Sequence, residues 1–210
     1  MPPRTLDLAP LQGARRFAAG TCPWLGWLWL ALVLSFSQAA WSADSTTFRT
    51  NYYSVTGATM REVRESIARN RPWRQSSPMD GRTDWTIRWR SNLDSSGQGA
   101  RVLSTEVTAT ITVTLPSWKP PEEVSEDMLE RWKRYFANLK RHEDGHVAIA
   151  LQAAAAVRQR TSAIREAPTV QELQRLIDRA GHQAMEEFKA KEKEYDRITQ
   201  HGVNQDAWRP

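Results

Sequence analysis

The chain has 210 residues, with 29 Lys and Arg against 24 Asp and Glu and a formal net charge of +5. Basic residues are spread among acidic ones and do not form a strip with aromatic side chains, so the composition argues against a nucleic-acid-binding protein. The only cysteine, Cys22, lies near the N-terminus. A single cysteine excludes an intramolecular disulfide and leaves any metal site to His, Asp and Glu.

Residues 1–43 have the pattern of a secretory signal peptide. A basic start that contains three arginines precedes an uncharged apolar run over residues 24–36. Small residues after this run permit cleavage behind Ala39 or Ser42. Because the run is shorter than the roughly 20 residues of a membrane-spanning helix, we expect cleavage rather than retention as an anchor.

The remaining segment, residues 44–210, is long enough for one domain with its own core. We expect mainly strands over residues 44–118 and mainly helices over residues 122–210. The signal predicts a secreted or periplasmic protein that would touch a membrane only through an uncleaved signal. The sequence leaves the oligomeric state open.

Strands around one helix are predicted for the first part of this segment. Residues 50–55 are rich in aromatic and β-branched side chains, and residues 83–90 alternate apolar with polar ones. Between them, residues 58–70 place apolar side chains at helical spacing. The clearest strand covers residues 101–115 and has one apolar face and one threonine-rich face. The threonine face is expected either to meet solvent or to line a polar cleft where an extended peptide adds as a strand.

Two long helices are predicted after the strands. Ser125, followed by two acidic residues, is typical of a helix start, and apolar side chains recur at three- or four-residue steps to about residue 160. Residues 169–172, Thr-Val-Gln-Glu, match the capping box of a second helix. The helical period is lost over residues 195–210, which we therefore expect to form a loop.

The stretch Lys140–Ala150, KRHEDGHVAIA, carries His-Glu-x-x-His. Residues four apart lie on one helix face, so His142 and His146 can point two imidazoles at one zinc ion. Glu143 flanks that face and can activate a zinc-bound water as general base. The alternative is a charged helix face, although unpaired inward histidines are costly. Gly145 costs a helix about 1 kcal/mol relative to Ala, which indicates either close approach of another segment or a tolerated defect.

A catalytic zinc ion usually has three protein ligands and an open position. The candidates for the third ligand here are His182, Glu186, Glu187, Asp196 and His201. On the residues alone His201 ranks narrowly first, because it follows the last helix in a loop beside a glycine, where the chain can fold back onto a neighbour.

Five stretches occur in one order along the chain: YYSVTGATMREVRESI, DWTIRWR, TVTLPSWKPP, RWKRYFANLKRHEDGHVAIA and EYDRITQHG. Together they resemble, over residues 49–202, a family of uncharacterised bacterial exported proteins described as predicted secreted zinc-dependent proteases. The resemblance implies a bacterial envelope protein and favours His201 as the third ligand. It rests most on the His-Glu-Asp-Gly-His core and on a tail that stands here as Tyr195, Asp196, Thr199, His201 and Gly202.

Two tail residues have candidate roles around a zinc ion bound by His142, His146 and His201. Tyr195 would either stabilise the oxyanion of the tetrahedral intermediate or only pack against its neighbours. Asp196 would either orient a ligand histidine through a hydrogen bond or cap the helix end.

These observations predict an α+β, zincin-like fold: a small antiparallel sheet of about three strands with one short helix, packed against two long C-terminal helices. The predicted function is an exported zinc metallopeptidase that acts on a peptide or protein of the cell envelope. One alternative is a non-catalytic binding or structural protein in which zinc joins the long helix to the tail. Another is a zinc amidase that acts on cell-wall peptides.

Overall fold

The computed structural model describes residues 45–73 and 79–205, which all belong to the second of the chain's two units, Ala39–Pro210. The predicted signal peptide, residues 1–43, lies outside the described residues and stays a prediction. Within the described ranges, no helix combines the length and the apolar content that crossing a membrane requires.

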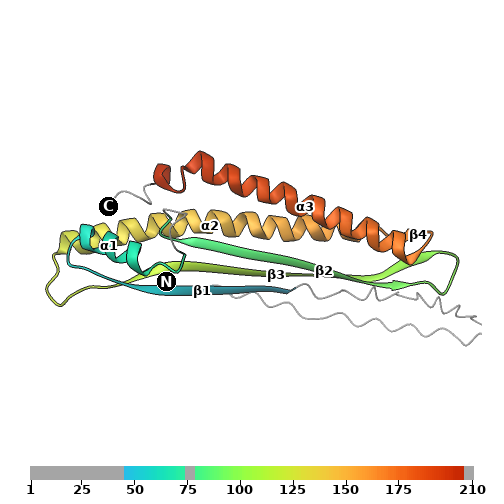
Figure 1. Ribbon diagram of the computed structural model, residues 1–210, viewed down its shortest axis with the longest axis horizontal. Coiled ribbons are helices and arrows are strands. Elements are labelled where there is room, and N and C mark those ends of the chain that lie inside the picture. The colour runs from blue at the N-terminus through green and yellow to red at the C-terminus, as the bar shows by residue number, and fades with distance from the viewer. Residues whose placement is uncertain (1–44, 74–78, 206–210) are drawn as a thin grey trace, which may run out of the picture. The chain divides into compact units, whose positions relative to one another are not determined.

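Three long strands, a short helix and two long helices make up this unit (Figure 1). In chain order the elements are β1 (Ser45–Thr56), α1 (Met60–Asn70), β2 (Arg82–Asp94), β3 (Ala100–Lys119), α2 (Glu126–Ser162), β4 (Glu166–Ala167), α3 (Val170–Thr199) and the 3-10 turn η1 (Val203–Gln205). The predicted α+β class is confirmed, and each predicted strand proves longer at its ends.

The sheet is mixed, which corrects the prediction of an antiparallel sheet. The short Ser/Gly connection joins β2 and β3 as an antiparallel hairpin, with an irregularity between Asn92 and Leu93. β1 pairs with the other edge of β3 and runs parallel to it, so the strand order is β1-β3-β2. Alternation along a strand predicts which side chains share a face but not which strand lies beside it. The two-residue strand β4, which pairs antiparallel with the first residues of β3, was not predicted.

The two faces of β3 have different surroundings. Val107, Ala109 and Ile111 are buried on the face that α2 covers, whereas Thr110 on the opposite face is exposed. Thr86 of β2 pairs with Thr110 and is exposed too. The solvent-facing interpretation of the threonine face therefore holds at the centre of the strand.

Both long helices begin where the sequence predicts. Ser125 accepts a hydrogen bond from the backbone N–H of Met128, and Thr169 accepts one from that of Glu172. The end of α3 differs from the prediction, because the helix continues to Thr199 and carries Tyr195 and Asp196 on its last turns. Ion-paired charges such as the 194–197 pair fill the exposed face of these turns and obscure the apolar period.

Helix α2 lies between the sheet and α3, and α3 runs back along it (Figure 1). The first half of α2 packs with α1, β1 and the end of β3 in one apolar cluster, which includes Leu139. The second half of α2 packs with β2, β3 and α3 in a second apolar cluster, whose first buried residue on α2 is Ala153. The segment 142–146 thus lies between two clusters that hold the helix rigidly on both sides.

Candidate metal centre

His142 and His146 lie one turn apart on α2 and point the same way. The two residues are 2% and 7% exposed, and their Nε2 atoms are 3.3 Å apart. The helical spacing predicted this convergence, and the apolar clusters on both sides account for the burial.

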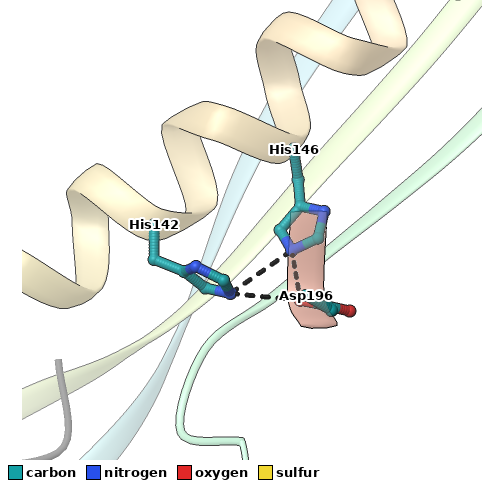
Figure 2. A group of neighbouring side chains, drawn as sticks. All are labelled: His142, His146 and Asp196. Carbon is teal, nitrogen blue, oxygen red and sulfur yellow. Dashed lines mark hydrogen bonds and ion pairs between the residues drawn. The ribbon is translucent and has the colours of Figure 1, made fainter. Parts of the chain in front are cut away.

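Asp196 of α3 completes a triangle with the two histidines (Figure 2). Its Oδ1 lies 3.1 Å from His146 Nε2 and 3.4 Å from His142 Nε2. Two zinc–ligand bonds of about 2.0–2.1 Å at a tetrahedral angle separate the ligand atoms by about 3.3–3.4 Å. All three edges of the triangle come close to that separation, so His142, His146 and Asp196 could hold a metal ion.

The outer nitrogen of each imidazole has its own partner. His146 Nδ1 lies 3.2 Å from Glu192 Oε1, and His142 Nδ1 lies 3.0 Å from Gln205 Oε1. Each Nδ1–H can donate to the oxygen beside it, which orients the ring and leaves Nε2 for a metal. Sequence reasoning missed both partners, although Glu192 and Asp196 are spaced four apart and so share a helix face.

The carboxylates around His146 alter its proton affinity. Burial opposes protonation, but the hydrogen bonds with Asp196 and Glu192 outweigh it and raise the pKa of His146 to about 9. Burial likewise opposes ionisation of Asp196, yet hydrogen bonds from both histidines hold the pKa of its carboxyl well below the usual range. The metal-free group therefore contains a strong His–Asp ion pair at neutral pH.

Tyr195 packs against the two histidines. Its ring stacks on His142 at 5.2 Å between centroids, and its hydroxyl donates to the His142 carbonyl oxygen over 3.2 Å. A side chain at Gly145 would overlap that hydroxyl, so the close approach predicted from the helical glycine is confirmed. The hydroxyl also accepts from Gln205 Nε2 at 3.2 Å. This geometry fits the packing role for Tyr195; the oxyanion role stays a prediction.

Glu143 is 2% exposed and faces the start of β2. The Thr83 hydroxyl donates to its Oε2 over 2.6 Å, and Gly81 lies against its Oε1. Burial raises the pKa of the Glu143 carboxyl, while Thr83 and the positive charges of His146 and His142 act in the opposite direction. A buried carboxyl beside two histidines is typical of a general base.

His201 lies at the edge of the group. Its backbone is left-handed at φ 53°, its side chain is 51% exposed, and its Nδ1 lies 3.5 Å from Asp196 Oδ1. Asp196, not His201, forms the triangle with His142 and His146. The role of His201 as a ligand stays a prediction.

The other candidates for the third ligand lie on α3 and contact residues outside the triangle. His182 packs edge-on against Trp89, and its Nδ1 bonds to the Asp178 carbonyl oxygen. Glu186 and Glu187 are exposed and form ion pairs with neighbouring basic residues.

A family model covers residues 50–202, which include the triangle, Glu143 and His201. The chain belongs to the DUF922 family. DUF922 is described as a bacterial protein of unknown function. No curated protein and no solved structure matches the chain. DUF922 membership agrees with the resemblance to uncharacterised bacterial proteins that the sequence indicates. The protease activity that the resemblance implies stays a prediction.

Proposed function

We propose that this DUF922 protein is an exported zinc metallopeptidase that cleaves peptides or proteins of the bacterial envelope. The observation that carries the proposal is the buried triangle of His142, His146 and Asp196 with Glu143 next to it in the chain. Two imidazoles and one carboxylate form a ligand set that zinc accepts in catalytic sites.

The donor chemistry supports zinc over magnesium or calcium. Two of the three atoms are imidazole nitrogens, whereas the hard cations prefer oxygen ligands. Histidine also binds nickel, copper and iron, so the proposal of zinc rests in addition on the near-tetrahedral separation of the three atoms. In this arrangement Asp196 takes the position of third ligand, and His201 contacts the same carboxylate, with its Nδ1 3.5 Å from Asp196 Oδ1.

Zinc, when bound, supplies a Lewis acid that polarises a substrate carbonyl and acidifies water. The protein supplies the remaining parts. Glu143 accepts the proton of the attacking water and returns it to the leaving amine. Glu192 and Gln205 keep the imidazoles in place through their Nδ1 atoms. The stacked ring of Tyr195 keeps α3, and hence Asp196, at a fixed distance from α2.

A structural metal site is the second candidate, and the burial of the three triangle residues favours it. Both histidines are almost fully buried, and the Asp196 side chain is only 22% exposed, so a metal here could simply join α2 to α3. A structural site, however, needs a fourth protein ligand and no base. The burial of Glu143 therefore supports catalysis, because an ionisable group with no task would be costly there.

Glu143→Gln tests the catalytic proposal. The purified protein is loaded with zinc, its metal content is measured, and a peptide library is incubated with the parent and the variant. We expect about one zinc per chain in both proteins and a loss of hydrolysis in the variant of roughly 100- to 10,000-fold. Hydrolysis that survives in Glu143→Gln would remove the base, and zinc binding without hydrolysis in the parent would favour the structural site.

Substrate class and location are tested separately. Cell-wall peptides with amide bonds to sugars, offered beside ordinary peptides, distinguish an amidase from a peptidase by which bond is cut. Cell fractionation checks export: we propose that the protein is secreted or periplasmic and that a version without residues 1–43 stays in the cytoplasm.

A further inference from the structure

The segment that precedes β2 is anchored by three aromatic side chains. The Trp73 indole N–H donates to the Met79 carbonyl oxygen over 2.9 Å, and the Tyr53 hydroxyl donates to the Asp80 carbonyl oxygen over 2.5 Å. The Tyr135 hydroxyl of α2 donates to Asp80 Oδ2 over 2.8 Å. Residues 79–80 are thereby fixed both to the sheet and to α2, the helix that carries His142 and His146.

This anchored segment then passes directly over the carboxylate of Glu143. A Cβ atom at Gly81 would lie 2.7 Å from Glu143 Oε1, so a side chain larger than hydrogen would displace the carboxylate. Two residues later, the Thr83 hydroxyl donates to Glu143 Oε2 over 2.6 Å. One oxygen of the carboxylate is thus held by a hydrogen bond, and the other lies against a glycine.

A general base acts only from the correct orientation. A displacement of about 1 Å at a catalytic group can cost roughly 100-fold in rate. The Glu143 side chain has several rotatable bonds and belongs to the helix, whereas Thr83 belongs to the sheet. A hydrogen bond between the two elements restricts the carboxylate more than contacts within the helix alone.

We propose that Thr83 is a positioning residue that holds Glu143 in the orientation needed for proton transfer, with Gly81 providing the room. This inference rests on the proposed function, because it assigns Thr83 to the same reaction. Neither residue contributes an atom to the metal triangle. A purely structural Thr83 would instead affect folding and leave turnover per folded, zinc-loaded molecule unchanged.

Thr83→Val keeps the shape of the side chain and removes the hydroxyl. We expect Thr83→Val to lower kcat by roughly 10- to 100-fold at unchanged zinc content and KM, and Thr83→Ser to restore kcat to within about threefold of the parent. Thr86→Val is the matched control, because Thr86 lies on the same strand with its side chain on the exposed face. A parental kcat in Thr83→Val overturns the inference. Thr83→Ala replaces Thr83→Val if the valine variant does not fold.

The visible spectrum of the cobalt(II)-loaded protein gives a readout that does not depend on turnover. We expect Thr83→Val to change the spectrum in the same direction as Glu143→Gln, and Thr83→Ser and Thr86→Val to keep the parental spectrum. If the parent hydrolyses nothing but the spectra respond in this way, the proposed function fails and the positioning contact stands. A parental spectrum in Thr83→Val overturns the positioning role, and a protein that binds no metal overturns both.

Discussion

One carboxylate oxygen of Asp196 lies close to three imidazole rings. Its Oδ1 lies 3.1 Å from His146, 3.4 Å from His142 and 3.5 Å from His201. An oxygen in that position can bind a metal together with the two buried histidines, while the exposed His201 interacts with it from outside. The carboxylate therefore has both the charge and the position of a ligand.

Alanine variants distinguish the two candidates for the third ligand. We expect Asp196→Ala to weaken zinc binding by more than the roughly 10- to 100-fold that loss of an outer partner costs, and His201→Ala to stay within that range. Competition with a chromophoric chelator measures both constants. A larger loss in His201→Ala than in Asp196→Ala would make His201 the third ligand.

Gly145 is the position on α2 where an added side chain would overlap Tyr195. The Tyr195 hydroxyl and ring occupy the place of a Cβ atom, and Tyr195 is itself stacked on His142. We expect Gly145→Ala to destabilise the protein by about 1–3 kcal/mol, because overpacking outweighs the higher helix propensity of alanine. Urea unfolding measures the change. Gly97→Ala is the control, since an added Cβ there meets no atom within 4 Å. A Gly145→Ala protein as stable as the parent would contradict the packing described for Tyr195.

If zinc binds as proposed, His146 should make the binding depend on pH. Its pKa of about 9 in the metal-free protein means that the ring is protonated at pH 7 and must release that proton before Nε2 can bind a metal. Apparent zinc affinity should therefore rise about tenfold per pH unit from pH 7 towards pH 9 and level off above it. The same shift stabilises the metal-free fold at low pH, and this contribution is lost as the pH rises through about 9.

Titration calorimetry in buffers of different ionisation enthalpy checks this dependence. We expect His146 to add about one proton per zinc bound at pH 7 and none near pH 10, on top of the proton that the zinc-bound water loses. Proton release at pH 7 no larger than the release from the bound water alone would mean that His146 is already neutral in the metal-free protein.

At the scale of elements, the triangle bridges α2 and α3. Two of its members come from α2 and the third from the last turns of α3. A metal bound by all three adds a link between helices that otherwise contact through side-chain packing. The C-terminal turns of α3 should therefore be the part of the fold that responds most to metal.

Zinc should stabilise the protein and protect this end of α3. At a zinc concentration about 1,000 times Kd, we expect about 4 kcal/mol of added stability and slower amide exchange over residues 192–199. Hydrogen–deuterium exchange and thermal unfolding measure the two effects, with Asp196→Ala as the comparison. Equal protection of α3 with and without zinc would argue against a bridge between the helices.

Regular elements could be predicted because their signals are local. The N-cap residues Ser125 and Thr169 and the helical spacing of apolar side chains gave both starts correctly. The parallel pairing of β1 with β3 could not be predicted, because nothing within a strand specifies its neighbour. The end of α3 was missed because charged residues cover its exposed face.

The residues of the site also fall into those that local sequence signals predict and those that only tertiary packing brings together. His142, Glu143 and His146 were predictable from a five-residue pattern whose geometry the helix determines. Thr83 and Gln205 approach from about sixty residues away on either side, and only the packing of β2 and η1 against α2 brings them there. Glu192 and Asp196 are four residues apart, a spacing that would have predicted a shared helix face. That inference depends on α3 extending to Thr199, whereas the sequence predicted a loop from residue 195.

At the scale of the described unit, one long helix organises both the core and the site. Helix α2 has 37 residues, and apolar clusters fix it before Leu139 and after Ala153. The metal triangle lies between these clusters, on the side where α3 packs, and β2 closes over Glu143. The packing on both sides keeps the three atoms of the triangle at a separation that a metal ion could bridge.

Anomalous diffraction from crystals of the zinc-loaded protein tests the central claim most directly. We predict one strong peak at the zinc edge, about 2.0–2.2 Å from His142 Nε2, His146 Nε2 and Asp196 Oδ1, with the Glu143 carboxylate beside an open coordination position. A zinc ion elsewhere in the molecule, or one at this position closed by a fourth protein ligand, would contradict the account.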